Sequence, residues 1–290
     1  MSFSSPGRVC GKLRTHERVI VSPTKSSADF RRVVSSHLEV WVVEEADIVL
    51  SIAVADDYDR VDEQLLVSVG GTDLEVTTHG NLHFIRNVPL GLLLVDYQAT
   101  VVGEAAPVAA TDLDVLRYIR PSRYCESDRI GPLARDEFDG LEGADLLAGV
   151  SSWVGTNIAY VTGSSRPIDG AVATLLGREG VCRDFAHLTT ALLRANDVPA
   201  RVVSVYAPGL VPMDFHAVTE AIIDGTWYVV DPTLLAPRDS LVRIATGADA
   251  SEIAFLTTLR GVVELNYMSV TATVDGDLPD DDITRLVRLR

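Results

Sequence analysis

Three residues of this chain have the types and the order that nucleophilic catalysis by a thiol requires. Cys182 lies just after Gly180, at the start of a long amphipathic helix, and His216 and Asp231 follow on two successive strands. A thiolate is the reactive form of cysteine, and both the positive end of a helix dipole and a neighbouring imidazolium favour it. The arrangement therefore predicts a thiol-based acyl-transfer site.

One turn assignment brings the histidine and the carboxylate together. Asp224-Gly225 is a strong signal for a two-residue hairpin, in which Ile223 pairs with Thr226. In that register His216 and Asp231 are diagonal neighbours on one sheet face, roughly 7 Å apart at their α-carbons. A slip of one residue would place them on opposite faces. The hairpin thus predicts a carboxylate that orients an imidazole.

Each of the three residues also has a structural interpretation. A lone cysteine in an amphipathic helix is more often a small buried hydrophobic residue than a nucleophile. His216 could be a hydrogen-bonded structural residue, and Asp231 before Pro232 could shape a turn. The catalytic interpretation is favoured because the three residues occur in order and one hairpin register joins two of them.

A developing oxyanion needs hydrogen-bond donors beside the nucleophile. The backbone N–H of Cys182 is one candidate, because the first N–H groups of a helix have no partner within it. Tyr160 and Trp153 are candidates for a second donor, although both also fit as core aromatic residues. His187 lies five positions along the same helix and is turned away from the cysteine, so we interpret it as structural.

The blocks around these residues resemble the bacterial transglutaminase-like superfamily, whose members have a papain-like Cys-His-Asp core and are often described as cysteine proteases. The resemblance covers most of the chain, since the first 110 residues are similar to the β-rich region that commonly precedes this core. It rests on Gly180–Leu188, Pro199–Val202, Asp214–Ala217, Trp227–Thr233 and the connector segment Arg120–Tyr124.

The resemblance implies that Cys182 is the nucleophile, His216 the general base and acid, and Asp231 the orienting carboxylate. One position departs from the family pattern. Many relatives have a tryptophan where Val218 stands, so we expect a smaller wall beside the histidine.

The hydrophobic patterns place these residues in an α+β chain with two parts. Short strands separated by turn residues predict an all-β sandwich or barrel-like domain over residues 1–110, including a hairpin at His79-Gly80-Asn81. Residues 111–136 are interpreted as a connector, extended near Arg117–Tyr124. Residues 137–260 are interpreted as the catalytic core, in which the helices precede the strands. Residues 261–290 are predicted to hold a last strand, Gly261–Val274, and a tail.

The helices of the core are predicted from apolar residues at three- and four-residue spacing. One helix is expected over Leu146–Ile158, a shorter one over Ile168–Leu176, and a third from Val181 to Ala195 with a single buried stripe. The expected strands are Ala200–Tyr206, Ala217–Ile223 and Thr226–Val230.

Composition narrows the classes of function and location. The net charge of −16 argues against nonspecific nucleic-acid binding. The cysteines Cys10, Cys125 and Cys182 are odd in number and far apart, which favours a reducing compartment over a disulfide framework. Neither Cys10 nor Cys125 has an evident activating environment. With no signal-peptide or membrane-spanning pattern, we expect a cytoplasmic protein that binds no membrane. No cofactor and no metal requirement are expected.

These observations predict an enzyme that hydrolyses peptide or glutamine amide bonds through a cysteine thioester, with a protein or peptide as substrate. Transfer of the acyl group to an amine would use the same intermediate. The alternative is a noncatalytic binding or scaffold protein with a vestigial triad, because fold resemblance does not fix function.

Overall fold

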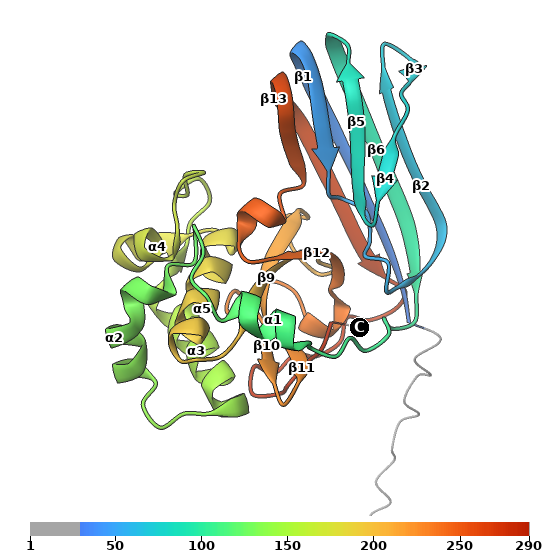
Figure 1. Cartoon of the computed structure of the whole chain (residues 1–290). Helices are drawn as coiled ribbons and strands as arrows, with labels where there is room; N and C mark the ends of the chain where they lie inside the picture. The colour runs from blue at the N-terminus through green and yellow to red at the C-terminus, as the bar shows by residue number, and fades with distance from the viewer. Residues whose placement is uncertain (1–29, 290) are drawn as a thin grey trace, which may run out of the picture.

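The computed structural model describes residues 30–289, which form a curled β-sheet beside an α+β core (Figure 1). We call β1–β6 together with β13 the β-sheet region, and the elements from α1 to β12 the α+β core. Cys10 lies outside the described residues. The α+β class predicted from the sequence is confirmed, with strands dominating the first part of the chain.

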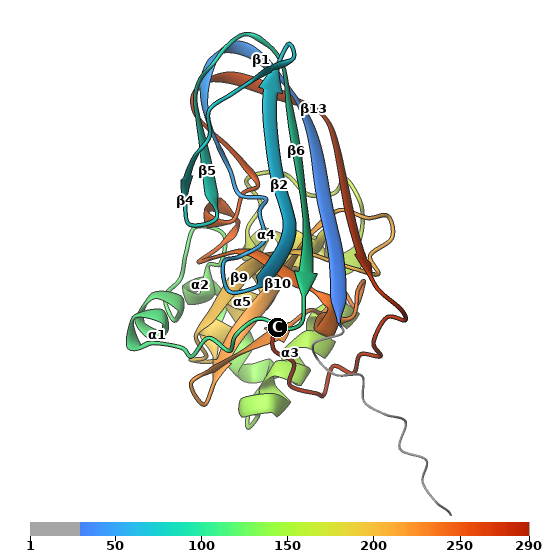
Figure 2. The ribbon, with the colours of Figure 1, turned by 90° about the vertical axis from the view of Figure 1, so that its right-hand side faces the viewer.

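The β-sheet region is built around β1 (Arg31–Leu50). The first part of β1 alternates exposed and buried residues, as expected for a strand with one face on a core. All strands of this region belong to one curled sheet. A sandwich would need two sheets, so the region resembles the expected barrel-like form more than the expected sandwich. In Figure 2, β4 and β5 lie to one side of β2 and β6. The strands in sheet order are β3 (Thr72–Asp73), β2 (Asp59–Val69), β6 (Gly91–Val102), β1, β5 (Leu82–Val88) and β4 (Thr77–His79).

The chain returns to this sheet after it has formed the core. β13 (Leu256–Val274) pairs antiparallel with β1 over nearly its whole length, which confirms that Gly261–Val274 returns to a sheet. The strand begins before Gly261, at Leu256. Bulges interrupt the pairing between Glu39 and Ile48, where the two strands bend together. The expected hairpin at Gly80 is also present, with His79 paired to Leu82.

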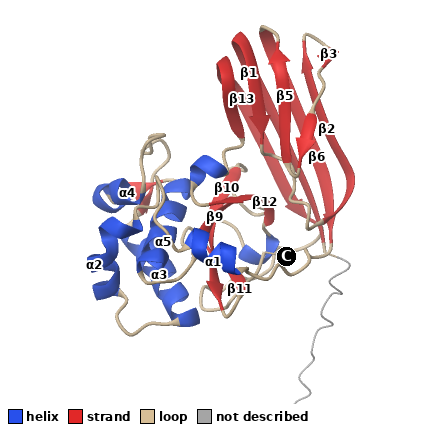
Figure 3. Ribbon diagram, in the orientation of Figure 1, coloured by secondary structure: helices blue, strands red, loops and turns tan. Residues whose placement is uncertain are grey.

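The helices of the core pack around α5 (Cys182–Ala195), as Figure 3 shows. The three helices expected in residues 137–260 are present within a few residues of their predicted bounds. The expectation of a single buried stripe on α5 is wrong, because every residue from Asp184 to Ala195 is buried. Helices cover one side of α5 and a sheet covers the other. The covering helices are α2 (Ser127–Glu137), α3 (Gly143–Asn157) and α4 (Ala171–Gly177).

The sheet of the core has four antiparallel strands, three of which the sequence predicted. Asp224 and Gly225 have positive φ angles, as a tight hairpin turn requires, and Ile223 pairs with Thr226 as expected. A strand that was not predicted forms one edge of the sheet. The order is β11 (Thr226–Val230), β10 (Phe215–Ile223), β9 (Ala200–Tyr206) and β12 (Val242–Gly247).

The predicted connector is largely helical, although residues 119–126, which include most of the segment expected to be extended, lie outside any helix. It contains α1 (Asp112–Tyr118) and most of α2. The Thr111 side chain accepts a hydrogen bond from the Asp114 N–H, and the Asp114 carboxylate accepts one from the Thr111 N–H. This capping box starts α1 and overrides the extended interpretation of Arg117–Tyr118.

Buried contacts fix the β-sheet region against the α+β core. Tyr206 of β9 donates its hydroxyl proton to the carbonyl oxygen of Ile52, at 2.8 Å. Val242 and Ile244 of β12 pack into the hydrophobic core enclosed by the curled sheet. The two regions therefore share this hydrophobic cluster, while the helices of the α+β core enclose a separate one. No helix within residues 30–289 is long and apolar enough to cross a membrane.

Candidate active site

The start of α5 is held in one conformation by Asp184. Its carboxylate accepts a hydrogen bond from the Val181 N–H at 2.9 Å and so caps the helix. Gly180 makes room for this carboxylate, since a Cβ there would lie 2.7 Å from the Cβ of Asp184. Cys182 is the first residue of α5, where the N–H has no partner within the helix. The thiol and this N–H thus project from the same helix end.

His216 and Asp231 are joined as the hairpin register predicted. His216 lies on β10, and Nε2 of its fully buried ring is 2.8 Å from Oδ2 of Asp231, just after β11. The other carboxylate oxygen, Oδ1, accepts hydrogen bonds from the Thr233 N–H at 2.9 Å and from the Thr233 hydroxyl at 2.7 Å. With both oxygens occupied, the carboxylate has one orientation and fixes that of the imidazole.

The surroundings of His216 favour its protonated form. Burial alone would lower the pKa of His216, but the charge of Asp231 and the hydrogen bond to it outweigh burial. Together with a smaller effect of Cys182, they raise the pKa to about 10. Because Nε2 is taken by Asp231, Nδ1 is the ring nitrogen left for the thiol. Within residues 30–289, Nδ1 is buried and meets no other hydrogen-bond partner.

The two described cysteines differ in their access to solvent. Cys182 is partly exposed, whereas Cys125 is completely buried. Burial raises the pKa of the Cys125 thiol to about 12, so this side chain stays a neutral core residue. Of the two, only Cys182 can be reached by a substrate.

Tyr160, one of the two proposed oxyanion donors, lies beside Cys182. A parallel bridge pairs β7 (Ala159–Tyr160) with β8 (Glu179–Gly180), which leads directly into α5. Burial and the charge of Cys182 raise the pKa of Tyr160 to about 12, so its hydroxyl keeps a proton to donate. Trp153 is placed elsewhere, because its indole N–H donates to the carboxylate of Glu137 at 3.0 Å.

His187 has the structural environment that its helix position predicted. Its ring stacks on Tyr124, with centroids 5.4 Å apart, and its Nε2 accepts a hydrogen bond from the Ala250 N–H at 3.1 Å. Burial lowers the pKa of His187 to about 3 and keeps the ring neutral. The residue holds the Ala250 segment, which forms one wall of the site.

A cavity of about 330 Å³ opens beside the triad. Cys182 and His216 form part of its lining, and most of the rest is apolar. Several lining residues come from the segment after β12 and from β13, far from the triad in sequence. No local pattern marks them, because long-range folding alone brings them to the thiol. Thr233, which fixes Asp231, could have been suspected from its position directly opposite His216 in the predicted hairpin.

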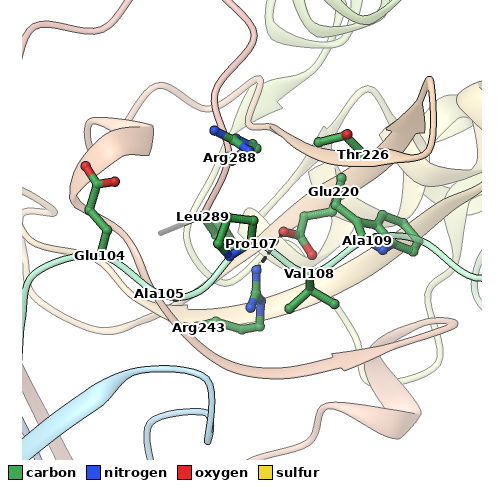
Figure 4. Close-up of a pocket in the computed structure, with 11 residues that line it drawn as sticks. Glu104, Ala105, Pro107, Val108, Ala109, Glu220, Thr226, Arg243, Arg288 and Leu289 are labelled. Atoms are coloured by element: carbon green, nitrogen blue, oxygen red, sulfur yellow. Dashed lines mark hydrogen bonds and ion pairs between the residues drawn. The ribbon is translucent and has the colours of Figure 1, made fainter.

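A second cavity, of about 220 Å³, does not include the triad (Figure 4). It lies over the buried carboxylate of Glu220, whose Oε1 accepts a hydrogen bond from Arg243 at 3.0 Å. The other oxygen, Oε2, accepts two hydrogen bonds from Arg201. Because both oxygens are held by arginines, we interpret this cluster as structural. Within residues 30–289, no group of three or more His, Cys, Asp or Glu side chains is placed to hold a metal ion.

Comparisons with known proteins identify the family. The family model of the transglutaminase-like superfamily matches residues 141–232, which contain all three triad residues. The crystal structure of a "putative cysteine protease" from Cytophaga hutchinsonii is 30% identical, with a TM-score of 0.79. The alignment covers 89% of this chain and 96% of that one. The chain belongs to the transglutaminase-like superfamily.

Membership places this transglutaminase-like chain in a family of thiol-dependent enzymes. The curated relatives are uncharacterized proteins. One from Mycobacterium leprae is 24% identical over 52% of this chain and 58% of its own length. One from Mycobacterium tuberculosis is 44% identical over 21% of this chain and 20% of its own length. The matches thus span less than two thirds of these two relatives.

Proposed function

We propose that this protein is a cysteine hydrolase that cleaves peptide or glutamine amide bonds, with Cys182, His216 and Asp231 as its catalytic triad. One observation carries the proposal. The His216–Asp231 pair is buried and fully oriented, while the neighbouring thiol at the helix start remains partly exposed. A solvent-accessible thiol beside a fixed imidazole is the arrangement that covalent catalysis by cysteine requires.

In the acylation step, the proton of the Cys182 thiol already resides on His216 as an imidazolium, and the thiolate sulfur attacks the carbonyl carbon of the substrate amide. A C–S bond forms and the carbonyl oxygen becomes an oxyanion. When this intermediate collapses, the C–N bond breaks and the leaving nitrogen takes the proton from His216. The result is a thioester on Cys182 and free ammonia or amine.

In the deacylation step, water attacks the thioester and gives one proton to His216. A C–O bond forms, the C–S bond breaks, and the sulfur leaves as the thiolate beside the imidazolium, which restores the starting ion pair as the acid leaves. An amine in place of water would form a new amide, so hydrolysis and cross-linking share one intermediate. Hydrolysis is the proposed outcome because water is always available.

Two groups are suited to stabilise the oxyanion in both steps. The Cys182 N–H lies at the positive end of α5, and the Tyr160 hydroxyl lies beside Cys182. Removal of one such donor typically costs roughly 10²–10³-fold in turnover. Because its hydroxyl lies beside Cys182 and keeps its proton, we assign Tyr160 as the second oxyanion donor. The noncatalytic scaffold alternative gives no reason for the thiol to remain partly exposed.

The test compares two cysteine variants on a library of peptides and glutamine-containing proteins. Cys182→Ala should abolish acid and ammonia release, whereas Cys125→Ala should retain it, because the buried Cys125 takes no part. Iodoacetamide should alkylate Cys182 faster than Cys125 in the folded protein. Full turnover by Cys182→Ala, or no preference of iodoacetamide for Cys182, would show that the proposal is wrong.

A further inference from the structure

The cavity beside the triad lies between the two regions of the molecule. Phe215 and Ile244 of the core sheet form one part of its wall, and Ile253 follows β12. Leu256 and Met268, both on β13, form another part. The β-sheet region therefore reaches the same space into which Cys182 and His216 project.

The bend of the sheet explains how one strand contributes twice to this wall. Leu256 and Met268 are separated along β13, yet both line the cavity because β13 curls back with β1. Gly261 lies within the bend at a φ of +85°, and a Cβ there would collide with the carbonyl oxygen of Glu45. The curl that closes the β-sheet region thus also shapes the cavity.

The size and lining of the cavity fit an apolar side chain. Its volume of about 330 Å³ is roughly twice the ~150 Å³ of an apolar cavity that takes up benzene. An aromatic or branched aliphatic side chain bound there would remove its apolar surface from water, which favours binding. The lining also includes four polar residues outside the triad, Ser51, Arg183, Ser204 and Asp214. The Ser51 hydroxyl is buried and has no hydrogen-bond partner within residues 30–289, so it is available to a polar group of a ligand.

The order of the two half-reactions indicates which part of a substrate a cavity beside the nucleophile would hold. The acyl part stays attached to Cys182 through both half-reactions, whereas the amine leaves after the first. A pocket that adjoins the nucleophile serves both steps only if it binds the acyl part. This assignment rests on the proposed function.

We propose that this cavity binds a large apolar side chain on the acyl side of the scissile bond, and that Met268 of β13 sets the size of side chain it accepts. The substrate class is then a peptide with an aromatic or branched aliphatic residue near the cleaved carbonyl. The β-sheet region acts as part of the specificity site, in addition to its packing against the core.

The experiment uses dipeptidyl chloromethyl ketones that carry Phe, Leu, Ala or Asn at the first or second residue from the reactive carbon. The Cys182 thiolate attacks the methylene carbon, a C–S bond forms, and chloride leaves. Because the reagent occupies only the acyl side, its rate reports on that side alone. Phe and Leu probes should alkylate Cys182 at least about tenfold faster than Ala and Asn probes.

Two variants of Met268 test the wall directly. Met268→Trp should slow the Phe probe about tenfold or more, and Met268→Ala should favour probes with still larger aromatic groups. The iodoacetamide rate should stay within about twofold in both variants, which also reports that the site is folded. Tyr267→Trp is the matched control, since Tyr267 is the adjacent residue of β13, lies half exposed and does not line the cavity.

The outcomes separate this inference from the proposed function. If iodoacetamide prefers Cys182 but the four probes react equally, the pocket assignment is wrong while the proposed function stands. The assignment to Met268 is wrong if Met268→Trp slows the Ala and Phe probes equally at an unchanged iodoacetamide rate. If iodoacetamide does not prefer Cys182, the proposed function and this inference both fail.

Discussion

At the scale of single residues, the hydrogen bond between His216 and Asp231 controls the proton that the proposed reaction moves. The imidazole is fully buried, and burial by itself would favour the neutral ring. Asp231 reverses this preference, and Thr233 fixes the carboxylate. The charge on the histidine therefore depends mainly on Asp231, with a smaller effect of Cys182.

Asp231→Asn should lower kcat/KM for a chromogenic ester by roughly 10³–10⁴-fold, as loss of an orienting carboxylate does in other triads. The pKa of His216 is raised to about 10, so the imidazolium of the wild type should be lost only as the pH rises through that value. In the variant, burial dominates and the alkaline limb should move to lower pH. The measurement is a pH profile of kcat/KM for both proteins.

Asp214→Asn is the matched control for this prediction. Asp214 also lies near His216, but its Oδ1 accepts a hydrogen bond from the Phe215 N–H. Its removal should change kcat/KM far less than the loss of Asp231. Equal losses in the two variants, or an alkaline limb that does not move in Asp231→Asn, would contradict the role assigned to Asp231.

At the scale of secondary-structure elements, the active site depends on how α5 begins. Gly180→Ala should displace the capping carboxylate of Asp184, because the added Cβ would lie 2.7 Å from the Asp184 Cβ. Overpacking of this kind typically costs about 1–3 kcal/mol, and it should also lower the alkylation rate of Cys182. The free energy of unfolding from urea titration and the iodoacetamide rate measure the two effects.

A second glycine of the same part of the chain provides the control. A Cβ at Gly177 in α4 would meet nothing within 4 Å, and its φ is not in the left-handed region. Gly177→Ala should be neutral or stabilising by up to about 1 kcal/mol, with unchanged thiol reactivity. If both alanine variants behave alike, the capping role of Asp184 is wrong.

The elements that carry the triad could be predicted from local sequence. The Asp224-Gly225 turn determined the register of β10 and β11, and periodic apolar residues predicted α5. The features that could not be predicted depend on information that local sequence patterns do not contain. The burial of α5 on all sides and the edge position of β12 depend on packing between distant segments. The helix α1 is different, because its capping box of Thr111 and Asp114 is a local signal.

At the scale of the whole molecule, a buried ionic cluster connects the core sheet to the β-sheet region. Glu220 accepts hydrogen bonds from Arg201 and Arg243, and Arg243 also pairs with Asp57, which precedes β2. Burial would raise the pKa of Glu220, but the two arginines outweigh it and lower the pKa. No local sequence pattern indicates this cluster, because its members come from distant segments.

Glu220→Gln should destabilise the protein by about 3–5 kcal/mol at pH 7, because it leaves two buried guanidinium groups without their shared carboxylate. The folded-state pKa of Glu220 is depressed below its ordinary value of 4.5, so the wild-type advantage is fully present above that pH. It should shrink as the pH falls through the depressed pKa. Urea titrations at several pH values, with the exposed Glu264→Gln as control, measure the difference.

An advantage of less than about 1 kcal/mol at pH 7, or one that does not shrink in acid, would contradict the structural interpretation of this cluster. In the first case the carboxylate would contribute no more than an exposed ion pair.

The central claim, that Cys182 forms an acyl intermediate with the help of His216, is tested most directly by trapping that intermediate. The protein is mixed with p-nitrophenyl acetate, quenched in acid, and digested for mass spectrometry. We predict an acetyl group on Cys182 in the wild type and its loss or strong reduction in His216→Ala. The account would be contradicted if Cys182 of the wild type carried no acetyl group. It would also be contradicted if Cys182 were acetylated equally strongly in His216→Ala.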